Sequence, residues 1–265
     1  MNTQVLKNHT ISGAPTAHRL LGAYLEEIRC EALRLLRNPG LVLPVLIMPM
    51  ALYALFAVVI AGEAITKDAG LGIFLFSAFS VMAISMPALF GLSSSFAMER
   101  EMGLMRLKRA QPAPAGSWLV AKIVCGVAFG ALSYLPMVII ATGTGKLPLA
   151  AGPLVNMSLA LIACSIPFCA MGLMVGSLVK GSAAAGYANL IYLPGCYLSG
   201  MFFPLPKSMY WQTPIWPQFH VTQLVMHAAG VEKFQYEPLL VALMSAIGFT
   251  GLFSAVAIWR LARKG

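Results

Sequence analysis

The sequence predicts an all-α, polytopic membrane protein with six transmembrane helices, and both its composition and its long apolar stretches support this class. Hydrophobic residues make up 59% of the 265 residues, and only 10% are charged. Soluble globular domains average about 45–50% apolar and about 25% charged residues. A soluble fold of this length could not bury so much apolar surface, so we expect lipid to surround most of the chain.

The N-terminal part is expected to lie outside the hydrocarbon core. Residues 1–17 are polar and predicted to be flexible, whereas residues 18–40 show apolar side chains at helical spacing with charges between them. This pattern predicts an amphipathic helix in the membrane interface. A soluble helix packed on a partner is the alternative. The residues assigned to the interface helix are Arg19, Tyr24, Arg34 and Arg37. Pro39 cannot continue the helix.

Six apolar stretches follow, within a transmembrane domain of residues 41–265. Each is long enough to cross about 30 Å of hydrocarbon at about 1.5 Å per residue. They cover residues 41–62, 71–97, 118–142, 153–179, 183–204 and 238–259. Lys122 lies near the start of the third, where its stem could reach back to the interface. GxxxG spacings at Gly126–Gly130 and Gly172–Gly176 predict close helix packing within the bundle.

Residues 205–237 interrupt the series before the last span. Prolines at 206, 214 and 217 exclude an uninterrupted transmembrane helix there. We expect short interfacial or re-entrant helices on the outer side of the membrane, with aromatic side chains such as Trp211 at the level of the headgroups.

The basic residues predict the orientation. Thirteen of the 18 lysines and arginines fall on one side of the predicted spans, and four fall on the other. Lys and Arg are enriched in cytoplasmic loops, so both termini are expected in the cytoplasm. We attribute the net charge of +9 to this topology and to anionic lipid, with no nucleic-acid partner.

The most charged loop of the protein lies on this predicted cytoplasmic side. "FAMEREMGLMRLKRAQPAPAGSW" at residues 96–118 holds the charges Glu99, Arg100, Glu101, Arg106, Lys108 and Arg109. Retention on the cytoplasmic side accounts for the basic residues but requires no carboxylates. An ordinary solvated loop is the alternative to a functional surface.

The sequence contains little that would support catalysis or cofactor binding. The nine acidic residues lie outside the spans or at their ends, which argues against a proton-coupled carrier. "TGTGKL" at 142–147 lacks the spacing of a phosphate-binding loop. The cysteines have no ligand spacing, so no metal site is predicted. His220 and His227, seven residues apart, could share a helix face as ligands or as polar lining.

Taken together, these segments resemble the membrane subunit of an ABC-2 type transporter, the permease of an ATP-binding-cassette exporter. The resemblance rests on "LRNPG" with Pro39, on the loop "EREMGLMRLKRAQPAPAGSWLVAK" with Lys122 in the next span, and on the late segment around "LSGMFFP". The late segment contains the family-pattern positions Ser199, Gly200, Phe203 and Pro204.

The resemblance implies that the charged loop is a coupling helix that docks on a separate ABC ATPase. Its expected residues are Glu99, Arg100, Glu101, Met102, Gly103, Leu104, Met105, Arg106, Leu107, Lys108 and Arg109. Glu99 and Glu101 would pair with basic residues of the ATPase or of the chain's own interface helix. This chain would bind no cofactor, because ATP and magnesium would be held by the ATPase.

The resemblance also implies the setting of the protein. We expect a bacterial inner membrane, two ATPase subunits and a second permease copy or a paralogue, in contact with membrane lipid. The cargo would be an amphiphilic drug, lipid or lipid-linked glycan that leaves the cytoplasm. A membrane-embedded enzyme or assembly factor that acts without an ATPase, with His220 and His227 at its centre, is the alternative, and a passive channel is a third possibility.

Overall fold

The computed structural model describes residues 17–110, 114, 116–145, 147–202 and 205–264, and these residues form helices and connecting turns without a strand. Five helical segments are long and apolar enough to cross a membrane. They are Val42–Ile60, Ala69–Glu101, Ser117–Gly143, Ala151–Leu178 and Leu239–Arg263. The predicted all-α membrane class is therefore confirmed. The predicted flexible segment lies outside the described residues, apart from Ala17.

The structure has one candidate span fewer than predicted among the described residues, and the difference is at the predicted fifth span, residues 183–204. Helix α10 (Ala184–Leu198) has 15 residues, which cover about 22 Å at 1.5 Å per residue, less than the hydrocarbon core. It ends where Gly200 takes a left-handed conformation with φ of 72°. Before it, the short 3₁₀ turn η3 (Gly181–Ala183) connects it to α9 (Ser165–Leu178), as the predicted tight hairpin requires.

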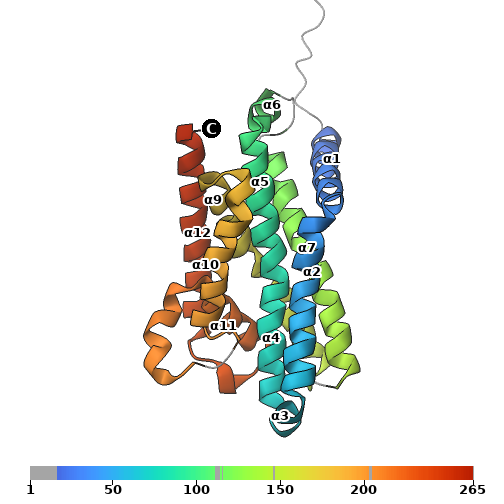
Figure 1. The fold of residues 1–265 in the computed structure, drawn as a ribbon, viewed down its shortest axis with the longest axis vertical. Helices are drawn as coiled ribbons and strands as arrows, with labels where there is room; N and C mark the ends of the chain where they lie inside the picture. Colours follow the sequence, from blue (N-terminus) through green and yellow to red (C-terminus); the bar gives the residue numbers. More distant parts are fainter. Residues whose placement is uncertain (1–16, 111–113, 115, 146, 203–204, 265) are drawn as a thin grey trace, which may run out of the picture.

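One long helical segment forms the centre of the bundle (Figure 1). It comprises α4 (Ala69–Met86), a π-helical turn η2 (Pro87–Gly91) and α5 (Leu92–Glu101). Its most apolar stretch is completely buried. Pro87 lacks a backbone N–H, and a π-helical turn is one way in which a helix absorbs such a break.

The helices around this central segment pack closely against it. They are α2 (Pro39–Tyr53), α7 (Ser117–Gly143), α9 and α11 (Pro217–Ala229). Glycines on α7 and α9 face its backbone: a Cβ atom on Gly130 would lie 3.1 Å from the carbonyl oxygen of Ile84. Gly126, Gly172 and Gly176 meet the same segment. Both GxxxG spacings therefore serve packing within the bundle, as predicted.

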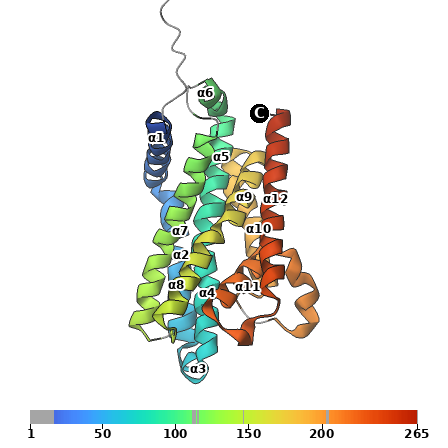
Figure 2. The same ribbon diagram turned by 180° about the vertical axis from the view of Figure 1, so that it is seen from behind.

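The segment before the last helix folds into short helices, as predicted. They are η4 (Lys207–Ile215), α11 and η5 (Glu232–Phe234). Helix α11 packs against α4, against α8 (Ala151–Ala163) and against the last helix α12 (Leu239–Lys264), and most of its side chains are buried. The views of Figures 1 and 2 agree that this segment lies toward the end of the bundle that also holds α3 (Gly62–Lys67).

The opposite end of the bundle gathers the first helix and the charged loop. Helix α1 (Ala17–Leu36), helix α6 (Leu104–Ala110) and the C-terminal end of α12 all lie there (Figures 1 and 2). Since α1, α6 and the end of α12 carry most of the described lysines and arginines, the charge asymmetry predicted from sequence is also an asymmetry in space.

Candidate functional site: a buried ion cluster beside helix α6

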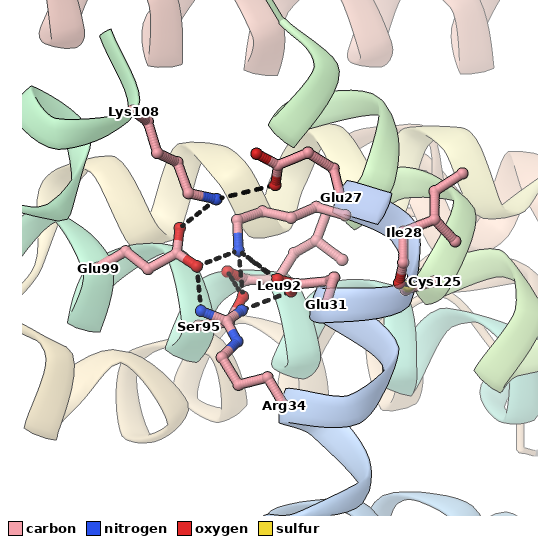
Figure 3. Close-up of polar contacts among 10 residues, drawn as sticks. Glu27, Ile28, Glu31, Arg34, Leu92, Ser95, Glu99, Lys108 and Cys125 are labelled. Atoms are coloured by element: carbon pink, nitrogen blue, oxygen red, sulfur yellow. Dashed lines mark hydrogen bonds and ion pairs between the residues drawn. The ribbon is translucent and has the colours of Figure 1, made fainter. Parts of the chain in front are cut away.

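Four helices meet where the charged loop leaves the bundle. Helix α5 ends at Glu101, and Gly103 takes a left-handed φ of 73°, which turns the chain into α6. Helix α1 packs along α7 on the other side of this point. Charged side chains from α1, α5, α6 and α7 therefore converge at this junction (Figure 3).

Lys122 of α7 is at the centre of the cluster. Its side chain is completely buried, with Nζ 3.1 and 3.2 Å from the two carboxylate oxygens of Glu31 and 3.0 Å from Oε1 of Glu99. A fourth contact of 3.2 Å joins Nζ to the hydroxyl of Ser95. The expectation that Lys122 reaches back to the interface stays a prediction; within the protein it reaches Glu31 of α1, where it is enclosed by other side chains. Two carboxylates compensate its desolvation, which makes an inward orientation possible.

Three more charged residues complete the cluster. Arg34 of α1 donates to both Glu31 and Glu99, while Lys108 of α6 lies 3.5 Å from Oε2 of Glu27 and 3.9 Å from Oε2 of Glu99. The cluster of Glu27, Glu31, Glu99, Arg34, Lys108 and Lys122 therefore has formal charge zero. Such neutrality is what allows a group of charges to leave water.

The two residues after Glu99 fix the end of α5 to other helices. The guanidinium of Arg100 donates to the carbonyl oxygens of Ser177 and Val179, at the end of α9. A carboxylate oxygen of Glu101 accepts from the backbone N–H of Gly181 at 2.9 Å, at the start of η3. Successive helical residues point about 100° apart, so three adjacent charges reach three different partners. These contacts explain the carboxylates that retention in the cytoplasm did not require.

Helix α6 presents apolar side chains on its outer surface. Met102, just before it, and Leu107 are each 62% exposed, whereas Met105 is buried against the bundle. Arg106 is exposed, and Leu104 is partly buried. The backbone of Arg109 belongs to α6, and its side chain is not among those that the structure describes. The arrangement is a short helix with Met105 and Lys108 on its inner face and an apolar, basic outer face.

Comparison with known proteins identifies the family. The family model for the ABC-2 type transporter matches residues 27–229, which is more than half of the chain. The chain belongs to the ABC-2 type transporter family. It is also 28% identical over 176 residues to the Bacillus subtilis (strain 168) protein named "Putative transport permease YvfS", a match that covers 66% of this chain and 71% of that protein.

Family membership gives the ion cluster a context. The family match begins in α1 and ends in α11, so it includes every residue of the cluster and the whole of α6. The protein is a transport permease of the ABC-2 type, and membership of this family implies that it pairs with an ABC ATPase subunit.

Only some of the predicted site residues of this permease come together. Arg34, Glu99, Lys108 and Lys122 meet in the cluster, and Arg34 supplies the intrachain partner expected for Glu99. The remaining interface-helix residues lie outside it: Arg19 and Arg37 are exposed, and Tyr24 is partly buried. Pro39 begins α2.

The late family-pattern positions do not take part in the cluster. Ser199 and Gly200 line a small pocket with Tyr210 and Phe219, beside the segment that contains α11. Phe203 and Pro204 lie outside the described residues.

Two members of the cluster, Glu27 and Glu31, and the neighbouring Ser95 were missed in the sequence. Glu31 and Ser95 complete the coordination of Lys122. Glu31 follows Tyr24 by seven residues and precedes Leu35 by four, so it falls on the apolar face of an amphipathic helix. A carboxylate on the apolar face of a helix needs a cationic partner when it is buried. The position of Glu31 in the sequence could therefore have indicated an ion pair.

His220 and His227 are both engaged by a single residue, Glu237. Nδ1 of His220 lies 2.8 Å from the Glu237 carboxylate and Nε2 lies 3.0 Å from the carbonyl of Pro214, while Nε2 of His227 lies 2.8 Å from the backbone carbonyl of Glu237. The described residues contain no group of three possible metal ligands. The contacts fit polar packing between α11 and the start of α12.

The His220 contact predicts how stability depends on pH. Burial alone would lower the pKa of His220, but the hydrogen bonds to Glu237 and Pro214 and the charge of Glu237 raise it above 6.5. Both neighbours are acceptors, so they favour the doubly protonated ring. A raised folded-state pKa stabilises the protein fully below the unfolded value, and this contribution is lost as pH rises through the folded value.

We therefore expect the apparent unfolding temperature of the detergent-solubilised protein to fall as pH rises from about 6.5 through the folded-state pKa of His220. Glu237→Gln should flatten this part of the profile. Asp68 cannot mimic the effect, because the hydrogen bond from Lys233 lowers the pKa of Asp68 below 3.8. An equally steep profile in Glu237→Gln would contradict the assignment.

Proposed function

We propose that the protein is the membrane permease subunit of an ABC exporter and that α6 is the surface on which the ATPase docks. The observation that supports this most directly is the shape of the α6 region. Its outer face exposes Met102 and Leu107, while Lys108 on its inner side meets the buried cluster. Exposed apolar side chains beside charges are typical of a recognition surface, in which apolar anchors supply affinity and charges supply register.

The location of α6 agrees with an ATPase partner. We place the end with α1, α6 and the C-terminus in the cytoplasm of a bacterial inner membrane, because most basic residues gather there. ATP and magnesium would be bound by two ATPase subunits and none by this chain. A second copy of the permease or a paralogue would complete the pathway. ATP must favour one state of the permease over the other, since equal binding to both shifts nothing.

The assignment of the membrane segments completes this proposal. We propose that α10 provides the sixth crossing, which would place both termini on one side. Helix α1 would lie in the cytoplasmic interface, because Leu21, Leu25 and Leu36 on its apolar side remain exposed although the helix packs on α7. Helix α11 would be re-entrant, with its backbone shielded by α4, α8 and α12.

The distribution of buried charge supports an amphiphilic cargo. Among the described residues, the buried side chains with a formal charge are Glu31, Glu99 and Lys122, all in the cluster at one end. Along the middle of the five described spans there is also no Asp, Glu, Lys or Arg, exposed or buried, that would pair with a strongly charged solute. We propose export of a hydrophobic drug, a lipid or a lipid-linked glycan.

The docking surface can be tested by co-purification. We expect the double variant Met102→Glu, Leu107→Glu to lose most of the ATPase that co-purifies with the tagged wild-type chain from its native membrane, because two carboxylates replace the apolar anchors. Trp211→Glu is the matched control, since Trp211 is also exposed but belongs to η4, far along the sequence and away from α6. Full retention of the ATPase by the double variant would contradict docking at α6.

A further inference from the structure

The ion cluster contains two kinds of contact. Lys122 is held by four contacts of 3.0–3.2 Å and has no exposed surface. Lys108 lies 3.5 Å from Glu27 and 3.9 Å from Glu99, longer than the roughly 2.7–2.9 Å of a well-formed charge-assisted hydrogen bond. Lys122 is thus the fixed part of the cluster, whereas Lys108 is shared between two carboxylates and tightly bound to neither.

One acceptor in the cluster is incompletely satisfied. Oε1 of Glu99 accepts hydrogen bonds from both Lys122 and Arg34. Oε2 of Glu99 is buried and has no hydrogen-bond partner. A buried carboxylate oxygen without a donor is costly. The Nζ atom of Lys108 lies 3.9 Å from it, so a displacement of α6 by about 1 Å toward α5 would form the missing bond.

The glycines that precede and follow helix α6 are not held by side-chain packing. Gly103 before it and Gly116 after it have φ values of 73° and 90°, and a Cβ at either would meet nothing within 4 Å. Both glycines therefore serve backbone conformation and not packing. Helix α6 packs mainly against α5, so the contact between Lys108 and Glu27 is its bridge to α1.

We propose that Lys108 is the positioning residue through which a displacement of α6 reaches α1 and the central helix. When α6 moves toward α5, the ammonium group approaches Oε2 of Glu99 and draws Glu27, and with it α1, in the same direction. The cluster stays neutral throughout, so no buried charge is left unpaired. This inference rests on the proposed function, because the docked ATPase supplies the displacement.

A merely structural ion pair would behave differently. The side chains of Lys108 and Glu27 are 21% and 20% exposed, and their 3.5 Å contact is long for a charge-assisted hydrogen bond, so a purely structural pair would contribute little to stability. A structural role therefore predicts a small change in unfolding temperature and no change in how α1 and α6 move together. The decisive measurement is the distance between these two helices in the ATPase complex.

The chain offers a natural label position for that measurement. Cys30 on α1 is exposed, whereas Cys125, Cys164, Cys169 and Cys196 are buried. A second spin label can be placed on α6 through Ala110→Cys, at an exposed position. Pulsed dipolar spectroscopy on the permease–ATPase complex, without nucleotide and with ADP and vanadate trapped after ATP hydrolysis, then reports the distance between α1 and α6.

In the wild-type background we expect one narrow distance distribution that ATP leaves nearly unchanged, because α1 follows α6. Lys108→Met and Glu27→Gln should each produce an ATP-dependent shift or broadening and lower the permease-dependent ATP hydrolysis by about fivefold or more. Lys108→Arg should restore the wild-type behaviour. Lys180→Met is the matched control, since it removes an exposed cation at the same end of the bundle but outside α6.

The two proposals fail in distinguishable ways. If no ATPase co-purifies with the wild-type chain from its native membrane, the proposed function and this inference are both overturned. A Lys108→Met chain that retains its ATPase and shows wild-type distances and hydrolysis overturns this inference alone. Equal effects of Lys180→Met and Lys108→Met would also overturn it, because they would indicate the net charge at this end of the bundle and not the contact of Lys108.

Discussion

Lys122→Met is expected to lower the apparent unfolding temperature of the detergent-solubilised protein by about 6–20 °C. The substitution leaves the carboxylates of Glu31 and Glu99 buried without their shared cation. Removing one partner of a buried ion pair costs about 3–5 kcal/mol, and each kcal/mol shifts the transition of a chain of about this size by roughly 2–4 °C. Arg34 still contacts both carboxylates, but it is partly exposed and cannot fill the space left by Nζ.

Two further variants distinguish the loss of the ion pair from a general effect of the substitution. Lys67→Met removes an exposed cation at the end of α3 and should leave the unfolding temperature unchanged. The triple variant Glu31→Gln, Glu99→Gln, Lys122→Met removes the uncompensated charges and should recover much of the loss, because neutral replacements of a buried ion group are often tolerated. A transition of Lys122→Met within about 2 °C of wild type would contradict the role of Lys122 at the centre of the cluster.

Gly176→Ala should destabilise the bundle by about 1–3 kcal/mol, the usual cost of overpacking a close contact. A Cβ atom at Gly176 would lie 2.7 Å from the carbonyl oxygen of Ser93, and this oxygen belongs to the backbone of the central helix and cannot turn away. Helix α9 would have to move off α5, which also strains the contacts of Arg100 with the end of α9. The measurement is the apparent unfolding temperature in detergent.

Gly248→Ala is the control for this substitution. Gly248 lies in α12, and a Cβ there would meet nothing within 4 Å. Alanine is the better helix former, so this variant should unfold at the wild-type temperature or slightly above it. Equal behaviour of the two variants would show that α9 can yield and that the close approach at Gly176 is not required.

The general class of the fold could be predicted because it depends on composition and length. Apolar stretches of about 20 residues have few alternatives to a membrane helix, and the structure contains five helical segments of that kind. The stretch at 183–204 also has no charged residue, yet α10 ends at Leu198 and the chain turns at Gly200. Hydropathy measures how well a segment tolerates lipid, and it does not show where a backbone turns to meet its neighbours.

The charged loop, too, could be predicted only in part from the sequence. Its unusual charge and its similarity to a coupling helix were visible in the sequence, and so was an amphipathic helix that carries Arg34. The roles of its carboxylates were not, because Glu99, Arg100 and Glu101 find partners in α1, in α9 and at the start of η3, all distant in the chain. Glu31 escaped notice since its partner Lys122 lies 91 positions away.

By itself, then, the sequence determined that this chain is a helical membrane protein, which end of it is basic, and which loop is unusual, because hydrophobicity and charge are properties of individual residues. Only the tertiary structure decided that Lys122 turns inward, that glycines of α7 and α9 face one central helix, and that Lys108 is shared between Glu27 and Glu99. These features depend on the relative rotation of helices about their axes, which is set when many side chains pack at once and which no single segment encodes.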